Sequence, residues 1–131
     1  MTFIVFGDTV KLVINQIEAV LPVPVVAAIP NPRPDEFVLV RLLGGTQRNV
    51  VTDQPTMTVE AFSATKPGAA ALLQKARAVI TQMPHDRSID PPVYLVQEFA
   101  GPADLPDPES TQERHTYTVS VAVRGATGVT L

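Results

Sequence analysis

Thirteen prolines in 131 residues constrain this chain more than any other feature, because most of them gather in three short segments. These proline clusters fall at 22–34, 84–92 and 102–108. Proline fixes φ, lacks an N–H donor and interrupts both helices and central strands. We interpret the clusters as rigid loops that punctuate the chain, not as a polyproline ligand. They divide the sequence into stretches that must each form a short element.

Two stretches between the proline clusters carry apolar residues at helical spacing. The first spans about 8–21, where Asp8 is a good N-cap and apolar residues recur every three to four positions. The second spans about 67–83, with Thr65 placed to cap it. A proline follows each stretch and ends the helix. The pattern predicts two amphipathic helices, each with one apolar stripe that packs on a sheet.

Five further segments are expected to be strands, because they alternate apolar and polar residues or are apolar throughout. Segment 36–43 is apolar on both faces except at Arg41, which predicts a place in the middle of a sheet. Gly44-Gly45 is expected to turn the chain, and 48–53 to be a short strand or an extended arm. The expected strands are 23–29 at a sheet edge, 36–43, 56–63, 93–99 and 116–124.

The order of these elements predicts an α+β fold in a single domain over residues 1–131. Strands come in consecutive groups, so we expect a mainly antiparallel sheet of about four to five strands. The two amphipathic helices most simply pack on one face of it. The acidic, proline-rich segment at about 101–112 is expected to be a flexible loop, and about 125–131 a flexible C-terminal tail.

Composition excludes several classes of site. The chain has no cysteine, which removes disulfides, thiolate metal sites and a cysteine nucleophile. Ten Lys and Arg stand against thirteen Asp and Glu, the pI is about 5.2 and aromatic residues are few, so we expect no nucleic-acid-binding face. The longest apolar stretch, 20–29, is short and broken by prolines. We therefore expect no membrane partner and synthesis in a cytoplasm.

Residues suited to catalysis or metal binding are sparse. His85 and His115 fall in or beside expected loops, and neither has a second histidine at helical metal-ligand spacing. His85 adjoins Asp86, which leaves open a small enzyme or a monomeric ligand-binding domain, although exposed loop histidines are the commoner explanation. The acids of 104–113 match no calcium-loop spacing. We expect no enzyme activity, no cofactor and no metal site.

The polar face of the expected sheet is the more informative surface. Thr58 and Glu60 on one strand and Ser120 on another leave small and charged groups there, and Arg41 projects from an otherwise apolar strand. Three interpretations stay open: a hydrated face, a core strand covered by long loops, or a face that packs on another subunit. Two helices cover only one side of such a sheet, so self-association is one way to cover the other side of strand 36–43.

Residues 30–63 (PNPRPDEFVLVRLLGGTQRNVVTDQPTMTVEAFS) combine several specific features. An Asn-Pro-Arg-Pro loop precedes an Arg-bearing strand, followed by a Gly-Gly pair, an Arg-Asn pair, a Thr-Asp before the next strand and an acid within that strand. In these features the block resembles the tail terminator proteins of actinobacterial siphophages. The flanking order of helices and strands is also similar, so the resemblance covers nearly the whole chain, although only the central block is specific.

The resemblance implies an assembly role without catalysis. Such proteins form a ring, commonly hexameric, that ends polymerisation of the tail tube and presents a surface to head-completion proteins. The implied partners are other copies of this chain, the major tail tube protein and the head-completion or neck proteins. Genomic DNA would pass through the ring without specific binding. The implied location is the head-proximal end of the virion tail.

Five charged residues of the matching block are candidate contacts between subunits. Arg33, Arg41 and Arg48 are the candidate donors, and Asp53 and Glu60 are candidate acceptors on an adjacent subunit. The alternative is that Arg41 and Glu60 pair within one chain as cross-strand neighbours. A head-closure or neck connector, or a minor tail protein, stays open as a same-class alternative to the terminator.

Overall fold

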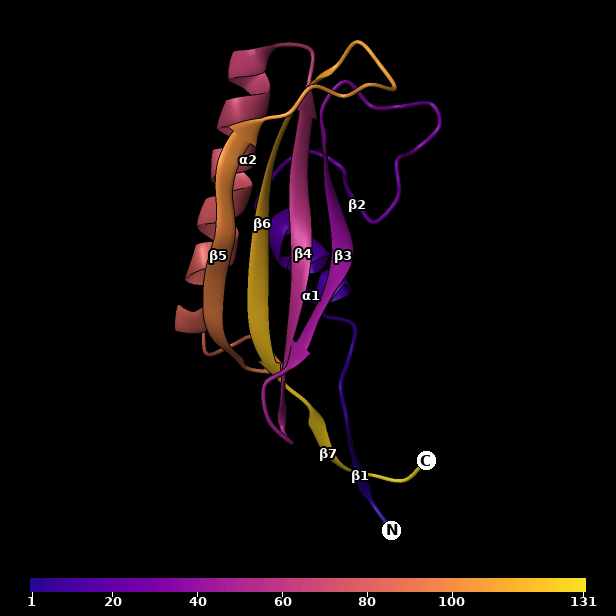
Figure 1. Cartoon of the computed structure of the whole chain (residues 1–131), viewed down its shortest axis with the longest axis vertical. Helices are drawn as coiled ribbons and strands as arrows, with labels where there is room; N and C mark the ends of the chain where they lie inside the picture. Colours follow the sequence, from indigo (N-terminus) through magenta and orange to yellow (C-terminus); the bar gives the residue numbers. More distant parts are fainter.

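Five strands form one sheet, and two helices pack on one of its faces (Figure 1). The strand order is β2–β3–β4–β6–β5 in this computed structural model, which describes residues 1–131. The short β2 is parallel to β3, and all other neighbours are antiparallel. The α+β fold with a mainly antiparallel sheet is thereby confirmed. The strands are β2 (Val25–Val26), β3 (Phe37–Gln47), β4 (Thr52–Ser63), β5 (Val93–Asp104) and β6 (Glu113–Arg124).

Both helices begin at the caps that the sequence indicates. The Asp8 carboxylate accepts a hydrogen bond from the Lys11 N–H at 3.0 Å, at the start of α1 (Thr9–Glu18). Thr65 accepts from the Gly68 N–H at 3.1 Å, at the start of α2 (Lys66–Gln82). These bonds satisfy backbone donors that the first helical turn leaves free. A short 3₁₀ turn, Met83–His85, follows α2.

The main core lies between the sheet and the helices. α1 packs on β2, β3 and α2, while α2 lies over β4, β6 and β5. Alternate side chains of each strand point into this layer, as the two-residue period of a strand requires. The fully buried members include Val13, Ile17, Val40, Met57, Val59, Leu73, Ile80, Tyr117, Val119 and Val121.

A second, smaller core lies on the opposite face of the sheet. Phe37 and Phe62 stack with ring centroids 4.4 Å apart, and Leu39 is buried beside them. Val26 of β2 and Ile29 of the loop that follows it pack against this cluster. The chain's own residues therefore cover the far side of β3 at these positions, as the alternative of a strand covered by loops predicts. The expected central position of this segment is corrected, because β3 lies beside the edge strand and β4 is the middle strand.

The turn between β3 and β4 lies later than the two glycines suggest. Gly44 and Gly45 belong to β3, with φ values of 125° and 110°, at an irregularity in its pairing with β4. The turn itself occupies 48–51, where the Arg48 and Asn49 N–H groups donate to the Thr52 carbonyl. The expected Gly-Gly turn and the expected strand or arm at 48–53 are therefore wrong. A β-bulge tolerates glycine at positive φ without ending the strand, which is the physical reason.

The two ends of the chain pair with each other. β1 (Phe3–Val5) and β7 (Ala126–Val129) form an antiparallel ribbon that projects from one end of the sheet (Figure 1). The sequence predicts no strand before the first helix and only a flexible tail after Arg124. That expectation is corrected, because each terminal segment finds its backbone partners in the other.

Candidate subunit interface

The sheet face opposite the helices carries a band of small polar side chains. Thr58 of β4 pairs with Thr118 of β6 and with Arg41 of β3 in one row across the sheet. In the next polar row Ser120 is buried, and its hydroxyl accepts a hydrogen bond from the Gln54 side chain at 3.0 Å. The polar face expected from the strand alternation is therefore present, and its hydroxyls and amides bond partly to one another.

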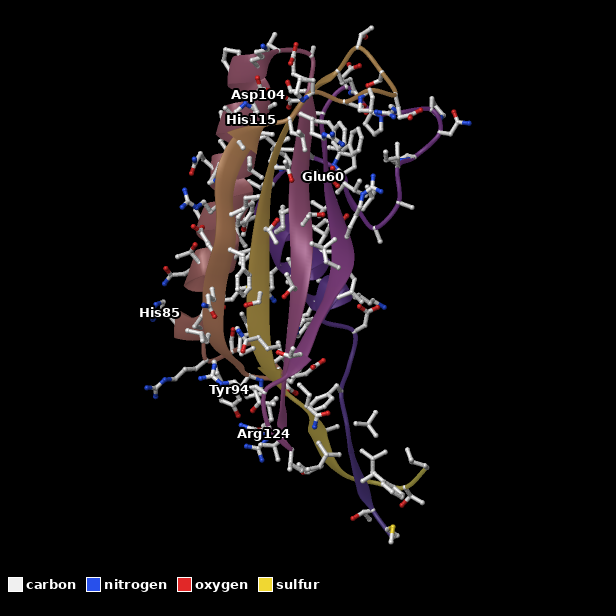
Figure 2. The ribbon with its side chains drawn as sticks, in the orientation of Figure 1. Glu60, His85, Tyr94, Asp104, His115 and Arg124 are labelled. Carbon is white, nitrogen blue, oxygen red and sulfur yellow. The ribbon has the colours of Figure 1, made fainter.

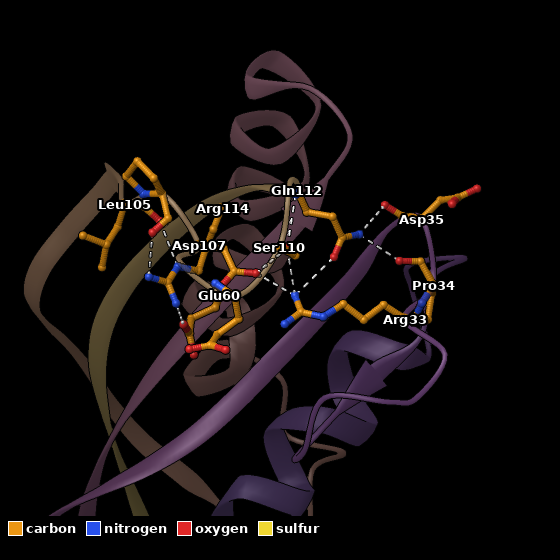
Figure 3. Close-up of polar contacts among 11 residues, drawn as sticks. Arg33, Pro34, Asp35, Glu60, Leu105, Asp107, Ser110, Gln112 and Arg114 are labelled. Atoms are coloured by element: carbon orange, nitrogen blue, oxygen red, sulfur yellow. Dashed lines mark hydrogen bonds and ion pairs between the residues drawn. The ribbon is translucent and has the colours of Figure 1, made fainter.

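Glu60 lies at one end of this polar face, between two guanidinium groups. Arg41 Nε donates to Glu60 Oε2 at 2.9 Å. Arg114 Nη1 donates to Glu60 Oε1 at 3.1 Å (Figure 3). The carboxylate is only 8% exposed, whereas Arg41 is 49% and Arg114 15% exposed. Arg114 also donates to the backbone carbonyls of Leu105 and Pro106. The group therefore joins three strands to the start of the acidic loop.

Arg33 and Asp107 connect the two proline-rich loops at the same end of the sheet. Arg33 Nη1 approaches Asp107 Oδ2 at 2.6 Å, and its guanidinium carbon lies 5.9 Å from the centre of the Phe62 ring (Figure 3). Gln112 donates to the Pro34 carbonyl at 2.9 Å, which adds a second link between the loops. Segment 101–112, expected to be a flexible loop, thus belongs to β5 up to Asp104 and is then held by charge-assisted hydrogen bonds.

The carboxylate of Asp107 is almost fully buried, with 3% of the side chain exposed. Desolvation raises the pKa of Asp107, but hydrogen bonds from the Ser110 hydroxyl, the Glu109 N–H and Arg33 outweigh it and hold the pKa below its usual value. The folded loop therefore favours the ionised form of Asp107.

The five candidate interface residues separate into two groups. Arg33, Arg41 and Glu60 are engaged within the chain, although only Arg41 and Glu60 pair with each other, as the intrachain alternative predicts. Arg48 lies in the exposed β3–β4 turn, Asp53 follows in β4, and neither forms an ion pair. Sequence reasoning missed Arg114 and Asp107, the partners that complete these groups. The alternation of β6 places Arg114 on the polar face and could have indicated it.

Exposed apolar side chains also lie at the other end of the molecule. Val50 of the β3–β4 turn is 71% exposed. Phe3 of the terminal ribbon is exposed as well, and residues 2–4 line a shallow groove together with Val50. Figure 1 shows the β3–β4 turn and the ribbon at the same end of the sheet. We call this region, made of Phe3, Val5 and Val50, the apolar end.

The two histidines considered for catalysis lie apart from each other. Figure 2 shows His115 near the top of the sheet and His85 well below it, beside the lower end of α2. Asp86 accepts hydrogen bonds from the Ser88 N–H and hydroxyl, at 2.9 and 2.6 Å, and these bonds lower its pKa. No group of His, Cys, Asp or Glu side chains is arranged to hold a metal ion. Neither helix has the length and apolar character needed to cross a bilayer.

In comparisons with known proteins, no family model matches this chain, and no curated protein matches it.

Proposed function

We propose that this chain is a structural virion protein that forms a ring on the end of a bacteriophage tail tube, ends tube polymerisation and provides the surface for head joining. The sequence of residues 30–63 supports this proposal through its resemblance to tail terminators. The α+β fold with two helices on one sheet face is compatible with the fold that the resemblance implies.

The observation that carries the proposal is the apolar end. Val50 of the β3–β4 turn and the apolar side chains of Phe3 and Val5 in the terminal ribbon are exposed at one extremity of an elongated molecule. Exposed apolar clusters of this kind mark surfaces that a partner covers. A surface at the extremity of the subunit suits stacking on another layer of an assembly, which is the contact that a tube-capping protein needs.

The proposal is tested by combining light scattering with a capping assay. We expect the protein to give a mass of several protomers, about six on the family resemblance, either alone or when added to assembled tail tubes. Electron microscopy should then show density on one end of each tube. A chain that stays monomeric and leaves both tube ends bare overturns the proposal. Binding to a head connector while tubes stay bare would indicate a neck protein in its place.

A matched pair of variants tests the role of the apolar end. We expect Val50→Asp to abolish or strongly weaken capping, because it places a charge in an apolar contact. Val20→Asp introduces the same charge at another exposed valine, just beyond α1, and should cap as the unaltered protein does. Equal capping by the two variants would show that the apolar end is not the contact surface.

A further inference from the structure

Both edges of the five-stranded sheet have unpaired backbone. β5 is an outer strand of twelve residues with no neighbour beyond it. On the other edge, β2 pairs with β3 only at Val38 and Leu39, so β3 has no strand partner on that side from Val40 to Gln47. Unpaired edges are templates for strand addition, and monomeric proteins usually protect them with charges, prolines or bulges.

The exposed side chains of these two edges include large apolar groups among charged and polar ones. Tyr94, Leu95 and Phe99 of β5 are exposed, as are Leu42 and Leu43 of β3, and charged side chains stand beside them on both strands. Segments 93–99 and 40–47 contain no proline or lysine, although both strands pair irregularly with their neighbours and β5 contains Pro102 further along. A strand added to either edge would cover apolar side chains that are exposed in the single chain.

The two free edges are suited to each other in direction. From β3 to β4, β6 and β5, every neighbouring pair is antiparallel, so β5 runs opposite to β3. If a second copy lies beside the first in the same orientation, β5 of one copy meets β3 of the next in antiparallel order. The sheet then continues across the contact with the same pairing that holds it together within the chain.

The two free edges also lie at the same level of the sheet. One row joins Leu42, Met57, Val119 and Glu98 across the four strands. A neighbouring copy therefore needs little displacement along the strand direction to align its free edge with this one. A head-to-tail contact closes into a ring only when such displacement does not accumulate, and otherwise gives a filament.

Space beside β5 is open to an incoming strand. A groove of about 830 Å³ runs between α2 and β5 and is lined on the helix side by Gln74, Ala78 and Thr81. Arg77 of α2 donates two hydrogen bonds to the Glu98 carboxylate across this groove. The positive charge of Arg77 balances that of the ionised carboxylate, and the hydrogen bonds lower the pKa of Glu98. The helix-facing side chains of an added strand have room in this groove.

We propose that the free edge of β5 pairs with the free 40–47 edge of β3 in a second copy, and that this head-to-tail contact is the ring contact. The inference rests on the proposed function only in taking the assembly to be a ring of identical copies. The two contact strands, β5 of one copy and β3 of the next, pair in antiparallel order.

The test uses one charge on each edge, Leu95→Glu in β5 and Leu42→Glu in β3. Each variant alone should associate on the order of a hundredfold more weakly than the unaltered protein, which corresponds to about 2.8 kcal/mol for an unpaired charge buried in the contact. Mixing the two variants leaves one intact β5 edge and one intact β3 edge. The mixture should therefore form a one-to-one dimer and nothing larger, because its remaining edges both carry Glu.

The control is Val20→Glu, which adds the same charge away from both edges and should associate normally. Far-UV circular dichroism and urea midpoints equal to those of the unaltered protein show that the variants are folded. Dimers of Leu42→Glu alone would indicate pairing of β5 with β5 and overturn the proposal. Normal association of both edge variants would overturn it while leaving the ring intact. A wild-type chain that never associates, alone or on tubes, overturns the ring itself.

Discussion

The two ends of this sheet differ in whether their apolar side chains are covered and in whether their charged groups are paired. At one end, the proline-rich loops cover Phe37 and Phe62, and the charged groups Arg33 and Glu60 have partners within the chain. We call this the closed end. At the apolar end, Phe3 and Val50 are exposed, and the neighbouring Arg48 has no ion partner. The charged groups of the closed end therefore contribute to the fold of the single chain, whereas the apolar end is the surface that we propose a partner covers.

This difference changes the interpretation of the charged residues in the block that resembles tail terminators. Arg33, Arg41 and Glu60 contribute to holding one subunit together, so their presence in the block does not require a contact between subunits. Buried charge pairs of this kind are weak evidence for stability but strong constraints on which groups must be present together. The intersubunit role stays a prediction for Arg48 and Asp53, which have free charges beside the apolar end.

The largest expected effect is the difference between the two ends in how far a substitution lowers the free energy of unfolding. Phe62→Ala removes a fully buried ring that stacks on Phe37, and we expect it to lower the free energy of unfolding by about 3–5 kcal/mol. Val50→Ala shortens an exposed side chain at the apolar end and should change that free energy by less than about 0.5 kcal/mol. Urea denaturation of both variants measures the difference. Similar losses would show that the apolar end is as much a part of the folded core as the closed end.

A smaller effect is expected at the carboxylate between two guanidinium groups. Glu60→Gln leaves Arg41 and Arg114 without their shared anion and should cost about 1–3 kcal/mol of folding free energy. Arg114→Gln should cost more than Arg41→Gln, because Arg114 is less exposed and also bonds to two loop carbonyls.

A double-mutant cycle on Glu60 and Arg114 measures their coupling, and Glu113→Gln is the control at a strand position without an ion pair. Additive losses for Glu60 and Arg114 would show that the pair contributes no coupling. Association of the Arg114→Gln and Glu113→Gln variants should stay unchanged, because both residues lie on β6, which is neither of the proposed contact edges.

Local signals predict the helices and most of the strands of this fold. Asp8 and Thr65 cap the helices where the sequence places them, because a cap depends only on residues within one turn. The ribbon of β1 and β7 gives no such signal, since each strand is short and its partner lies at the other end of the chain. Gly44-Gly45 misleads for a different reason: the same residues that permit a tight turn also permit a bulge within a strand.

In the candidate site too, only the contacts that follow from local sequence rules could be predicted. Arg41 and Glu60 could be predicted as neighbours, because adjacent strands joined by a short turn place their side chains on a common face. Arg33 and Asp107 are 74 residues apart and meet through two irregular loops. No periodicity relates loop positions, so their pairing depends on the path of the backbone and could not be read from the sequence.

The smallest expected effect is the pH dependence of the loop that Asp107 holds. The folded pKa of this carboxyl lies below its usual value of about 3.9, so the folded state binds its proton less readily than the unfolded state does. Its contribution to stability is therefore fully present above that usual value and is lost as the pH falls through the lower, folded pKa. We expect Asp107→Asn to cost roughly 1 kcal/mol at neutral pH, the scale of one or two lost hydrogen bonds.

The same substitution should make the loss of stability below about pH 4 shallower than in the unaltered protein. Urea midpoints measured across the acid range test both expectations. Glu109→Gln is the matched control, because its side chain lies in the same loop but is exposed and has no ion partner. If Asp107→Asn and Glu109→Gln follow the same pH curve, the Arg33–Asp107 link does not stabilise the closed end. The contrast between the two ends would then rest on the buried phenylalanines alone.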